Sequence, residues 1–185
     1  MNKAIFLDRD GTLIEEKGYI CHLEQSYIFP FAAQAILRMH ELGFKVIVIS
    51  NQSAIARGTC TTAQVEQIHA DIARVLWQEN ARIDKFYYCP YHPKGIVPQY
   101  RQKHHWRKPQ PGMILQAAQD FKLSLPDSYM IGDDLCDIQA GLQAGCKTIL
   151  VLTGKGEQTR VKLAQEGLTP DLITENILTA IQALD

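Results

Sequence analysis

The chain has 185 residues, of which 46% are hydrophobic and 21% are charged, and this ordinary globular composition excludes a disordered or fibrous protein. Its formal net charge of -1 offers no general attraction for nucleic acid or for an anionic membrane. No apolar run approaches the roughly 18 residues of a membrane span, and Met1 to Leu7 is too short for the apolar part of a signal peptide. We therefore expect a cytoplasmic monomer with one domain over residues 1 to 185.

Short runs rich in β-branched residues alternate with segments of helical period, which is the pattern of parallel βαβ units. Several of these runs are apolar on both faces, as expected for strands that helices cover on each side. The predicted fold class is therefore α/β, a doubly wound parallel sheet with no large cap domain. The predicted strands are Ala4 to Leu7, Lys45 to Ser50, Lys85 to Tyr88, Tyr129 to Ile131 and Thr148 to Leu152.

Apolar periodicity and terminal signals indicate helices between these strands. A first helix precedes the stop signal Gly43, and a second opens at Thr61 with Gln64 three residues on, as in a capping box. The apolar positions that support these two helices are Ala33, Ile36, Leu37, Val65, Ile68, Ile72, Val75 and Leu76. Further helices are predicted at about Gly112 to Asp120, Asp134 to Ala144 and Glu175 to Leu184.

Two segments do not fit the alternation of strands and helices. Ile14 to Phe31 separates the first strand from its helix, and Cys89 to Trp106 is a loop insertion rich in Pro, His and Tyr. Connections of this length are uncommon in a compact domain unless they serve a function. We expect both to be functional loops over the carboxyl ends of the strands.

The five cysteines are odd in number and widely scattered, and no two form a C-x-x-C pair. This spacing suits a reducing compartment better than a disulfide framework. We interpret most of them as small, buried apolar residues. They are Cys21, Cys60, Cys89, Cys136 and Cys146.

Polar residues follow the predicted strands at the end where a doubly wound sheet binds its ligands. These candidates are Asp8 and Asp10 after the first strand, Ser50 and Asn51 after the second, Lys108 ahead of a helix, and Asp133 after the fourth strand. Carboxylates this close repel one another, and a divalent cation such as Mg²⁺ resolves the repulsion. Lys108 and Ser50, with backbone N–H groups, then suit the remaining oxygens of a phosphate.

Four motifs occur in an order that resembles the haloacid dehalogenase (HAD) superfamily of phosphatases. They are DRDGT at Asp8 to Thr12, SNQS at Ser50 to Ser53, RKPQPG at Arg107 to Gly112 and GDDLCD at Gly132 to Asp137. The segments NQSAIARG, CPYHP and RKPQPGM are similar to its heptose-bisphosphate and histidinol-phosphate phosphatase branch, and TGKG at Thr153 to Gly156 extends the likeness. The resemblance implies a HAD-like Rossmannoid fold and a magnesium-dependent phosphoric monoester hydrolase.

The resemblance also implies how the residues act. Asp8 attacks the phosphorus and becomes an aspartyl-phosphate, and Asp10 protonates the departing sugar oxygen and then takes a proton from the attacking water. Asp8, the backbone carbonyl of Asp10 and Asp133 hold Mg²⁺. Ser50 and Lys108 stabilise the phosphoryl oxygens from the other side.

The substrate that the resemblance implies is a small sugar bisphosphate, such as D-glycero-D-manno-heptose 1,7-bisphosphate cleaved at position 7. The residues carried over for substrate binding are Glu16, Lys17, Gly18 and Tyr19 at the sugar, Asn51, Gln52 and Ser53 with Ser50 at the phosphoryl group, and Arg107. Arg57 is a further candidate for a positive contact, and Asp134 adds negative charge beside the metal aspartate.

Many members of this branch carry a structural zinc ion on a C-P-H-H-P loop and a following C-x-C. Here Tyr91 occupies a usual histidine position, and His104, His105 and Trp106 replace the C-x-C. A rearranged zinc site would need Cys89, His92, His104 and His105, because tetrahedral zinc takes four N or S donors. We expect instead that aromatic packing by Tyr91 and Trp106 closes this loop.

Three other functions compete with the heptose reading. A histidinol-phosphate phosphatase shares almost every catalytic residue. A polynucleotide 3′-phosphatase could use Arg101 to Lys108 as a nucleic-acid patch, but no extended basic face is evident, so we expect neither nucleic acid nor membrane as a partner. A non-catalytic sugar-phosphate-binding module conflicts with the intact set of Asp8, Asp10, Ser50, Lys108 and Asp133.

Overall fold

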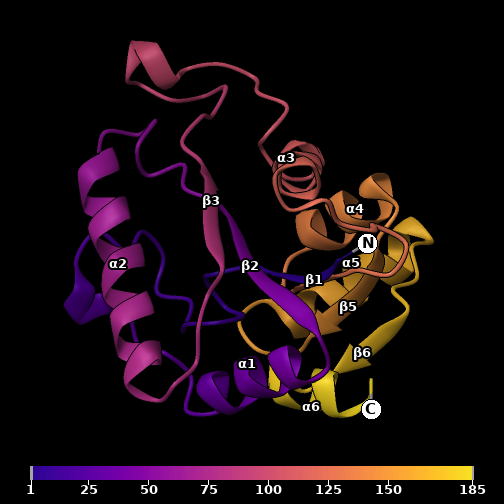
Figure 1. Ribbon diagram of the computed structural model, residues 1–185. Helices are drawn as coiled ribbons and strands as arrows, with labels where there is room; N and C mark the ends of the chain where they lie inside the picture. Colours follow the sequence, from indigo (N-terminus) through magenta and orange to yellow (C-terminus); the bar gives the residue numbers. More distant parts are fainter. Residues whose placement is uncertain (1, 185) are drawn as a thin grey trace.

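The computed structural model describes residues 2 to 184, and its centre is a six-stranded sheet in which all neighbouring strands are parallel. The strands lie in the order β3, β2, β1, β4, β5, β6 (Figure 1). This arrangement confirms the predicted α/β fold class. The strands are β1 Lys3–Leu7, β2 Phe44–Asn51, β3 Lys85–Cys89, β4 Tyr129–Gly132, β5 Lys147–Val151 and β6 Leu172–Thr174.

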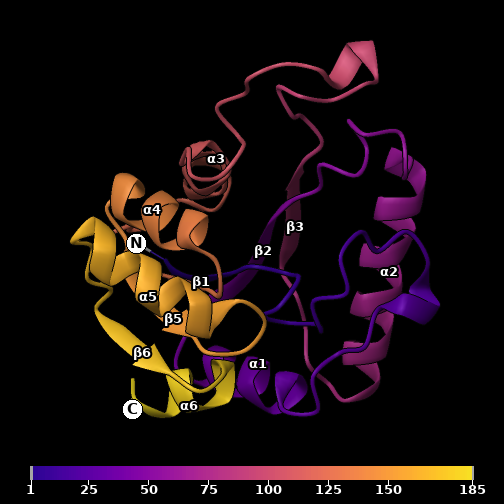
Figure 2. The same cartoon turned by 180° about the vertical axis from the view of Figure 1, so that it is seen from behind.

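Helices cover both faces of the sheet. The opposite views in Figures 1 and 2 show α1, α2 and α6 on one side and α3, α4 and α5 on the other. The helices are α1 Ala32–Glu41, α2 Thr62–Gln78, α3 Gly112–Phe121, α4 Leu135–Ala144, α5 Gly156–Glu166 and α6 Ile177–Gln182, with short 3-10 turns at Leu23–Gln25 and Pro98–Tyr100. None of the helices within residues 2 to 184 is long and apolar enough to cross a membrane.

Alternate residues of the central strands pack into two hydrophobic cores, one on each face of the sheet. In β1, Ile5 and Leu7 pack in the core with α1, α2 and α6, whereas Ala4 and Phe6 pack in the core with α3 and α4. Successive side chains of a strand point to opposite faces, so a strand that is covered on both sides is apolar throughout. Every one of these four side chains is fully buried.

The five strands that the sequence predicts are all present, with ends that differ by one residue or none, and all five predicted helices lie near their expected positions. The capping box at Thr61 is confirmed, because its side chain accepts a hydrogen bond from the backbone of Gln64, whose side chain in turn accepts one from Thr61 N–H. In the first helix the expected apolar position Leu37 is 37% exposed. The structure adds β6 and α5, which the sequence analysis did not predict.

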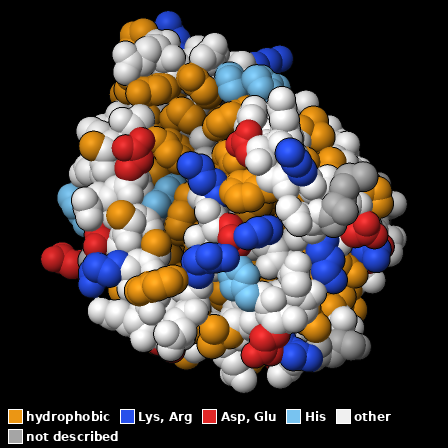
Figure 3. Space-filling view, viewed as in Figure 1, with side chains coloured by type: hydrophobic (Ala, Val, Ile, Leu, Met, Phe, Trp, Pro, Cys, Tyr) orange, Lys and Arg blue, Asp and Glu red, His pale blue; other side chains and the backbone are white. Residues whose placement is uncertain are grey.

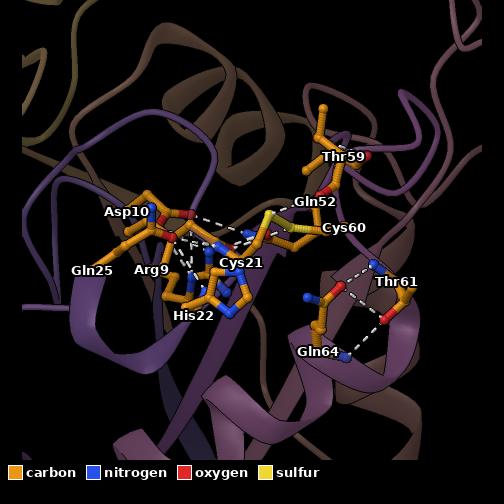
Figure 4. The surroundings of a disulfide bond; sticks show 12 residues. Arg9, Asp10, Cys21, His22, Gln25, Gln52, Thr59, Cys60, Thr61 and Gln64 are labelled. Carbon is orange, nitrogen blue, oxygen red and sulfur yellow. Dashed lines mark hydrogen bonds and ion pairs between the residues drawn. A yellow bond between two sulfur atoms is a disulfide. The ribbon is translucent and has the colours of Figure 1, made fainter.

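The interpretation of all five cysteines as unpaired is wrong for two of them. Cys21 and Cys60 form a disulfide with a Cα separation of 5.5 Å (Figure 4). Cys21 lies in the long loop after β1, and Cys60 lies in the loop between β2 and α2. The two loops leave neighbouring parallel strands at the same end of the sheet, so cysteines 39 positions apart meet. Cys89 and Cys146 are free and buried, as expected, and Cys136 is free and partly buried.

Candidate active site

A cavity of about 570 Å³ lies beyond the carboxyl ends of the central strands. The strand β1 lies between β2 and β4. The connection after β1 leads to β2 on one side, and the connection after β4 leads to β5 on the other side. Such a switch point opens the crevice where doubly wound sheets bind ligands. The predicted site residues that line the cavity are Asp8, Asp10, Glu16, Gly18, Tyr19, Ser50, Asn51, Gln52, Ser53, Arg107, Lys108, Asp133 and Asp134.

Three buried aspartates meet on the wall of this cavity. Carboxylate oxygens of Asp8, Asp133 and Asp137 all lie within 4.8 Å of one another, and this is the group of metal-ligating side chains found in the described part of the chain. Burial raises the pKa of Asp8 well above its usual range, against the lowering effect of Lys108. Burial and the neighbouring Asp137 raise the pKa of Asp133 to about 7. Without a cation, this cluster therefore resists ionisation.

Lys108 lies between two of these carboxylates and is 3% exposed. Its Nζ donates to Oδ1 of Asp8 at 2.6 Å and to the carbonyl of Ile49 at 3.0 Å, and it pairs with Oδ1 of Asp137 at 2.6 Å. Burial alone would lower the pKa of Lys108, but Asp137 and Asp8 raise it well above its usual range. When all three aspartates are ionised, Lys108 neutralises one of the three negative charges. One Mg²⁺ would balance the remaining two.

The side chain of Asn51 holds the backbone of Lys108. Asn51 Nδ2 donates to the carbonyl of Lys108, and the N–H of Lys108 donates to Asn51 Oδ1, both at 3.0 Å. The sequence suggested that Asn51 contacts the phosphoryl group. In the structure both polar atoms of its side-chain amide bond to the backbone of Lys108, so Asn51 holds the lysine in position.

Asp133 does not cap α4, since Asp134 is the N-cap, and one of its oxygens lies close to Asp8 and Asp137. Its Oδ1 accepts from Thr12 Oγ1 at 3.1 Å, and its Oδ2 accepts from the backbone N–H of Lys155 at 2.8 Å. Gly11 and Gly154 leave room for this carboxyl, since a Cβ at either position would collide with it. Both glycines also have a positive φ, +86° and +55°. Buried carboxylate oxygens in such a cradle fit Mg²⁺, which favours hard oxygen ligands.

Asp10 lines the cavity and is held from behind by polar side chains. Its carboxylate accepts from Nη2 of Arg9 and from Nε2 of Gln52, each at 3.0 Å. The same Gln52 nitrogen donates to Oγ of Ser50 at 2.7 Å. Ser50 and Gln52 are therefore joined to Asp10 in one network, although they come from a different strand end.

Lys155 connects the loop after β1 with the start of α4. Its Nζ pairs with Glu16 at 3.2 Å and with Asp134 at 3.4 Å. Burial alone would lower the pKa of Lys155, but Glu16 and Asp134 raise it. Asp134 is also the N-cap of α4, because its side chain accepts from the N–H of Cys136 while Asp137 accepts from the N–H of Asp134.

Two predicted substrate contacts lie outside the cavity wall. Lys17 pairs with Glu15 at 3.0 Å, and its Nζ lies 5.7 Å from the ring centroid of Tyr27. The Arg57 guanidinium lies 6.0 Å from the ring centroid of Tyr19, which lines the cavity. The ion pair with Glu15 explains the position of Lys17, whereas Nε of Arg57 is buried without a hydrogen-bond partner among the described residues.

The proposed zinc ligands do not assemble. Cys89, His92, His104 and His105 are all described, yet they form no group close enough to share an ion. His104 instead stacks on Tyr91 with ring centroids 4.3 Å apart and on His105 at 4.4 Å. Both Tyr91 and Trp106 pack against the buried core beside β3. Apolar side chains gather in the upper part of the face in Figure 3, next to histidine. Ring packing is therefore the observed means of closing this loop.

Several residues of the site were not predicted. Asp137 and Lys155 contact the core of the site, Thr12 orients Asp133, and Arg9 supports Asp10. The signal for all four was present, because Arg9 and Thr12 stand inside DRDGT, Asp137 inside GDDLCD and Lys155 inside TGKG. The contacts that define these roles join distant positions. Lys155 meets Asp133 across 22 positions, and the neighbouring Thr153 meets Gly11 across 142. The order of the motifs alone does not predict such contacts.

Comparisons with known proteins agree with this geometry. A family model described as HAD-hydrolase-like matches residues 105 to 180. The chain is 36% identical to the D-glycero-D-manno-heptose-1,7-bisphosphate 7-phosphatase of Chlorobaculum tepidum, over 97% of this chain and 92% of the relative. It is 40% identical to the D-glycero-beta-D-manno-heptose-1,7-bisphosphate 7-phosphatase of Escherichia coli, over 82% of this chain and 80% of the relative.

A solved structure extends the comparison to three dimensions. The crystal structure of the D,D-heptose 1,7-bisphosphate phosphatase from B. bronchiseptica, complexed with magnesium and phosphate, aligns with a TM-score of 0.87 and 33% identity. The alignment covers 98% of this chain and 97% of that one. The chain is thus similar over nearly its full length to a protein of the same fold that binds magnesium and phosphate.

Proposed function

Because the chain belongs to the HAD-like phosphatases, in the family of D-glycero-D-manno-heptose-1,7-bisphosphate 7-phosphatases, we propose that it hydrolyses the 7-phosphate of this sugar bisphosphate. The convergence of Asp8, Asp133 and Asp137, two of which pair with Lys108, carries this proposal. A buried cluster with excess negative charge suits a divalent cation and, through it, a phosphoryl group. The proposal treats residues 1 to 185 as one domain acting as a monomer.

In the first step, Asp8 acts as the nucleophile. Lys108 engages Oδ1 of Asp8, so we assign the attack on phosphorus to Oδ2. As the bond from Asp8 to phosphorus forms, the bond from phosphorus to the sugar oxygen breaks, and Asp10 delivers a proton to that oxygen. A covalent intermediate divides one difficult displacement into two easier ones.

In the second step, water attacks the aspartyl-phosphate while Asp10 takes a proton from it, which releases phosphate and restores Asp8. Lys108 would donate to a phosphoryl oxygen in place of one of its present acceptors, and the hydroxyl of Ser50 would donate to another. We assign Asp8, Asp133 and the backbone carbonyl of Asp10 as the residues that would hold Mg²⁺. The ion would supply positive charge where negative charge develops on the phosphoryl oxygens.

The rest of the cavity would bind the sugar and the second phosphate. Glu16, Gly18 and Tyr19 lie on the wall formed by the loop after β1, opposite residues that come from the other strand ends. Arg107 lines the same cavity and contributes positive charge, with one nitrogen donating to the carbonyl of Tyr91 at 3.3 Å. These contacts favour a substrate with a sugar hydroxyl face and an additional anionic group.

Phosphate release from a small substrate panel tests the proposal. The panel contains both anomers of D-glycero-D-manno-heptose 1,7-bisphosphate and histidinol phosphate, each with and without magnesium. We expect the highest kcat/KM for one heptose anomer with magnesium, and a heptose 1-phosphate as the product identified by NMR. A higher kcat/KM for histidinol phosphate would show that the chain is a histidinol-phosphate phosphatase. A rate of phosphate release that does not depend on magnesium would contradict the proposed site.

The Asp8→Asn variant is the matched control for this assay. An amide nitrogen does not attack phosphorus as a carboxylate oxygen does, so we expect loss of turnover with an unchanged circular dichroism spectrum. Retention of more than a trace of activity by the purified variant would remove the covalent scheme.

A further inference from the structure

Arg9 is a buried side chain for which the proposed mechanism gives no role. It is 1% exposed, and it lies behind Asp10 rather than on the cavity wall. A buried guanidinium is strongly unfavourable unless its donors are paired. Here Nε and Nη2 face Asp10, Nη2 also donates to Gln52, and Nη1 faces His69. Every nitrogen of Arg9 is therefore engaged.

Arg9, Asp10 and Gln52 form a closed triangle of hydrogen bonds (Figure 4). Nη2 of Arg9 donates at 3.0 Å to Oδ1 of Asp10 and at 3.0 Å to Oε1 of Gln52. Nε2 of Gln52 donates at 3.0 Å to Oδ2 of Asp10. Nε of Arg9 also donates to both oxygens of Asp10 at 3.2 Å, so each carboxylate oxygen accepts two hydrogen bonds and the carboxyl is fixed in direction.

His69 of α2 completes the surroundings of Arg9. Its Nε2 lies 3.2 Å from Nη1 of Arg9, and its ring stacks on Phe86 of β3 at 4.7 Å. Burial, with a further contribution from Arg9, lowers the pKa of His69 to about 3. The imidazole is therefore neutral, and because guanidinium only donates, Nε2 is the acceptor and Nδ1 carries the proton.

We propose that Arg9 and His69 are positioning residues for Asp10, with Gln52 as the third support. Arg9 fixes the direction of the Asp10 carboxyl, and His69 fixes Arg9 by accepting a hydrogen bond from its Nη1. This chain of contacts runs from α2 through the loop after β1 to the proton-transfer group. The inference rests on the proposed function, because it assumes that Asp10 exchanges protons during phosphoryl transfer.

The proposal predicts a dependence on the leaving group. During phosphoryl transfer to Asp8, the electron pair of the breaking bond goes to the leaving oxygen, and a sugar alkoxide needs the proton of Asp10 to depart. A p-nitrophenolate departs readily without that proton. Because kcat/KM reports the steps up to this transfer, misplacing Asp10 should lower it for a sugar phosphate far more than for p-nitrophenyl phosphate.

The main test compares His69→Leu with His69→Gln. Leucine removes the acceptor for Arg9, whereas the amide oxygen of glutamine restores one. We expect His69→Leu to lower kcat/KM for the heptose bisphosphate about 10-fold more than for p-nitrophenyl phosphate, as for a misplaced general acid. We expect His69→Gln to recover most of that difference. Leu76→Ala, which weakens the same helix without contacting Arg9, should change both substrates equally.

A second variant guards against a failure to fold. Arg9→Lys keeps the buried charge but cannot place donors on Asp10, Gln52 and His69 together. We expect the same leaving-group difference, with a cooperative thermal transition showing that the variant is folded. Equal losses for both substrates in every folded variant would overturn the inference. An inactive wild-type protein on heptose bisphosphate would instead contradict the proposed function, which is a distinguishable result.

Discussion

At the scale of single residues, the contact of Lys108 with two buried carboxylates sets the chemistry of the site. Removing one partner of a buried ion pair leaves a charge without compensation, which commonly destabilises a protein by about 3 kcal/mol. Asp137 is fully buried, and it meets Lys108 at 2.6 Å. It is therefore as important to the lysine as the nucleophile Asp8 is.

We predict that Asp137→Asn lowers kcat at least 10-fold, because Lys108 loses one of its two carboxylate anchors. The free energy of unfolding should change by less than the about 3 kcal/mol of a fully broken pair, because Asp8 still pairs with Lys108. Chemical denaturation and phosphate release measure the two effects. Asp71→Asn is the control, since Asp71 forms an exposed pair with Arg74 on α2 and should leave both quantities nearly unchanged. An Asp137→Asn protein with wild-type kcat would show that the second carboxylate is dispensable.

His69 makes a separate prediction about acid stability. Its pKa is lowered to about 3 in the folded protein, first by burial and then by Arg9, whereas an unfolded histidine titrates near its ordinary value of 6.5. Between these values the unfolded state binds more protons, so acid favours unfolding. From pH 7 to pH 5, the wild type should lose about 2 kcal/mol more than His69→Gln. Parallel denaturation curves at the two pH values would contradict this.

Sequence reasoning located the residues that carry a distinctive chemistry at a strand end. Asp8, Asp10, Ser50, Lys108 and Asp133 were all predicted, and all line the cavity. Residues that act through space were missed. Arg9 belongs to the DRDGT motif, but its partner His69 is 60 positions away on α2. There His69 lies among the buried apolar residues of the helix, so the sequence gives no sign of its contact with Arg9. Only the folded chain shows that such a pair meets.

At the scale of elements, the loop after β1 is tied to the start of α2 by the disulfide between Cys21 and Cys60. A cross-link over 39 positions restricts the unfolded chain and so stabilises the folded one. It also holds the segment that brings Glu16 and Tyr19 to the cavity wall. The disulfide therefore connects local stability with the shape of the proposed sugar site.

We predict that reduction by dithiothreitol lowers the free energy of unfolding by about 2 to 4 kcal/mol. Cys60→Ser should show the lower stability with or without reductant, whereas Cys146→Ser, at a buried free thiol, should keep the dependence on reductant. Thiol titration of unreduced, denatured protein should find three of the five cysteines. Five reactive thiols, with no response to reductant, would show that the bond does not form in solution.

The same scale explains which elements the sequence predicted. The central strands are long apolar runs because helices cover both faces, and that pattern is visible in one dimension. The edge strand β6 has three residues, none fully buried, and in α5 only Gly156, Thr159 and Leu163 are buried. Neither element has enough apolar residues to produce a periodic signal. Their position is decided by pairing with β5 and by packing on α4.

At the scale of the whole molecule, a nearly neutral chain concentrates like charge at one point. The formal net charge is only -1, yet Asp8, Asp133 and Asp137 share one buried cluster. Burial makes their ionised forms unfavourable, so a bound cation should stabilise the entire fold and not only the catalytic step. The size of that effect must depend on pH, because protons and Mg²⁺ compete for the same carboxylates.

Asp133 sets the pH range of this competition. Its pKa rises from the ordinary value of 3.8 to about 7, first because of burial and then because of Asp137. Because of the raised pKa, the metal-free folded state binds more protons at Asp133 than the unfolded state does between about pH 4 and pH 7. The contribution of Asp133 to the free energy of unfolding therefore falls as the pH rises through this range. Magnesium requires the ionised carboxylate and should offset that loss above pH 7.

We therefore predict that magnesium raises the thermal midpoint more at pH 8 than at pH 6. A tenfold weaker affinity at the lower pH corresponds to about 1.4 kcal/mol less stabilisation at saturating metal. Differential scanning calorimetry with magnesium chloride, against sodium chloride of equal ionic strength, measures the difference. Asp133→Asn should lose most of the magnesium shift at both pH values. A shift of equal size at pH 6 and pH 8 in the wild type would mean that magnesium does not displace the proton from Asp133.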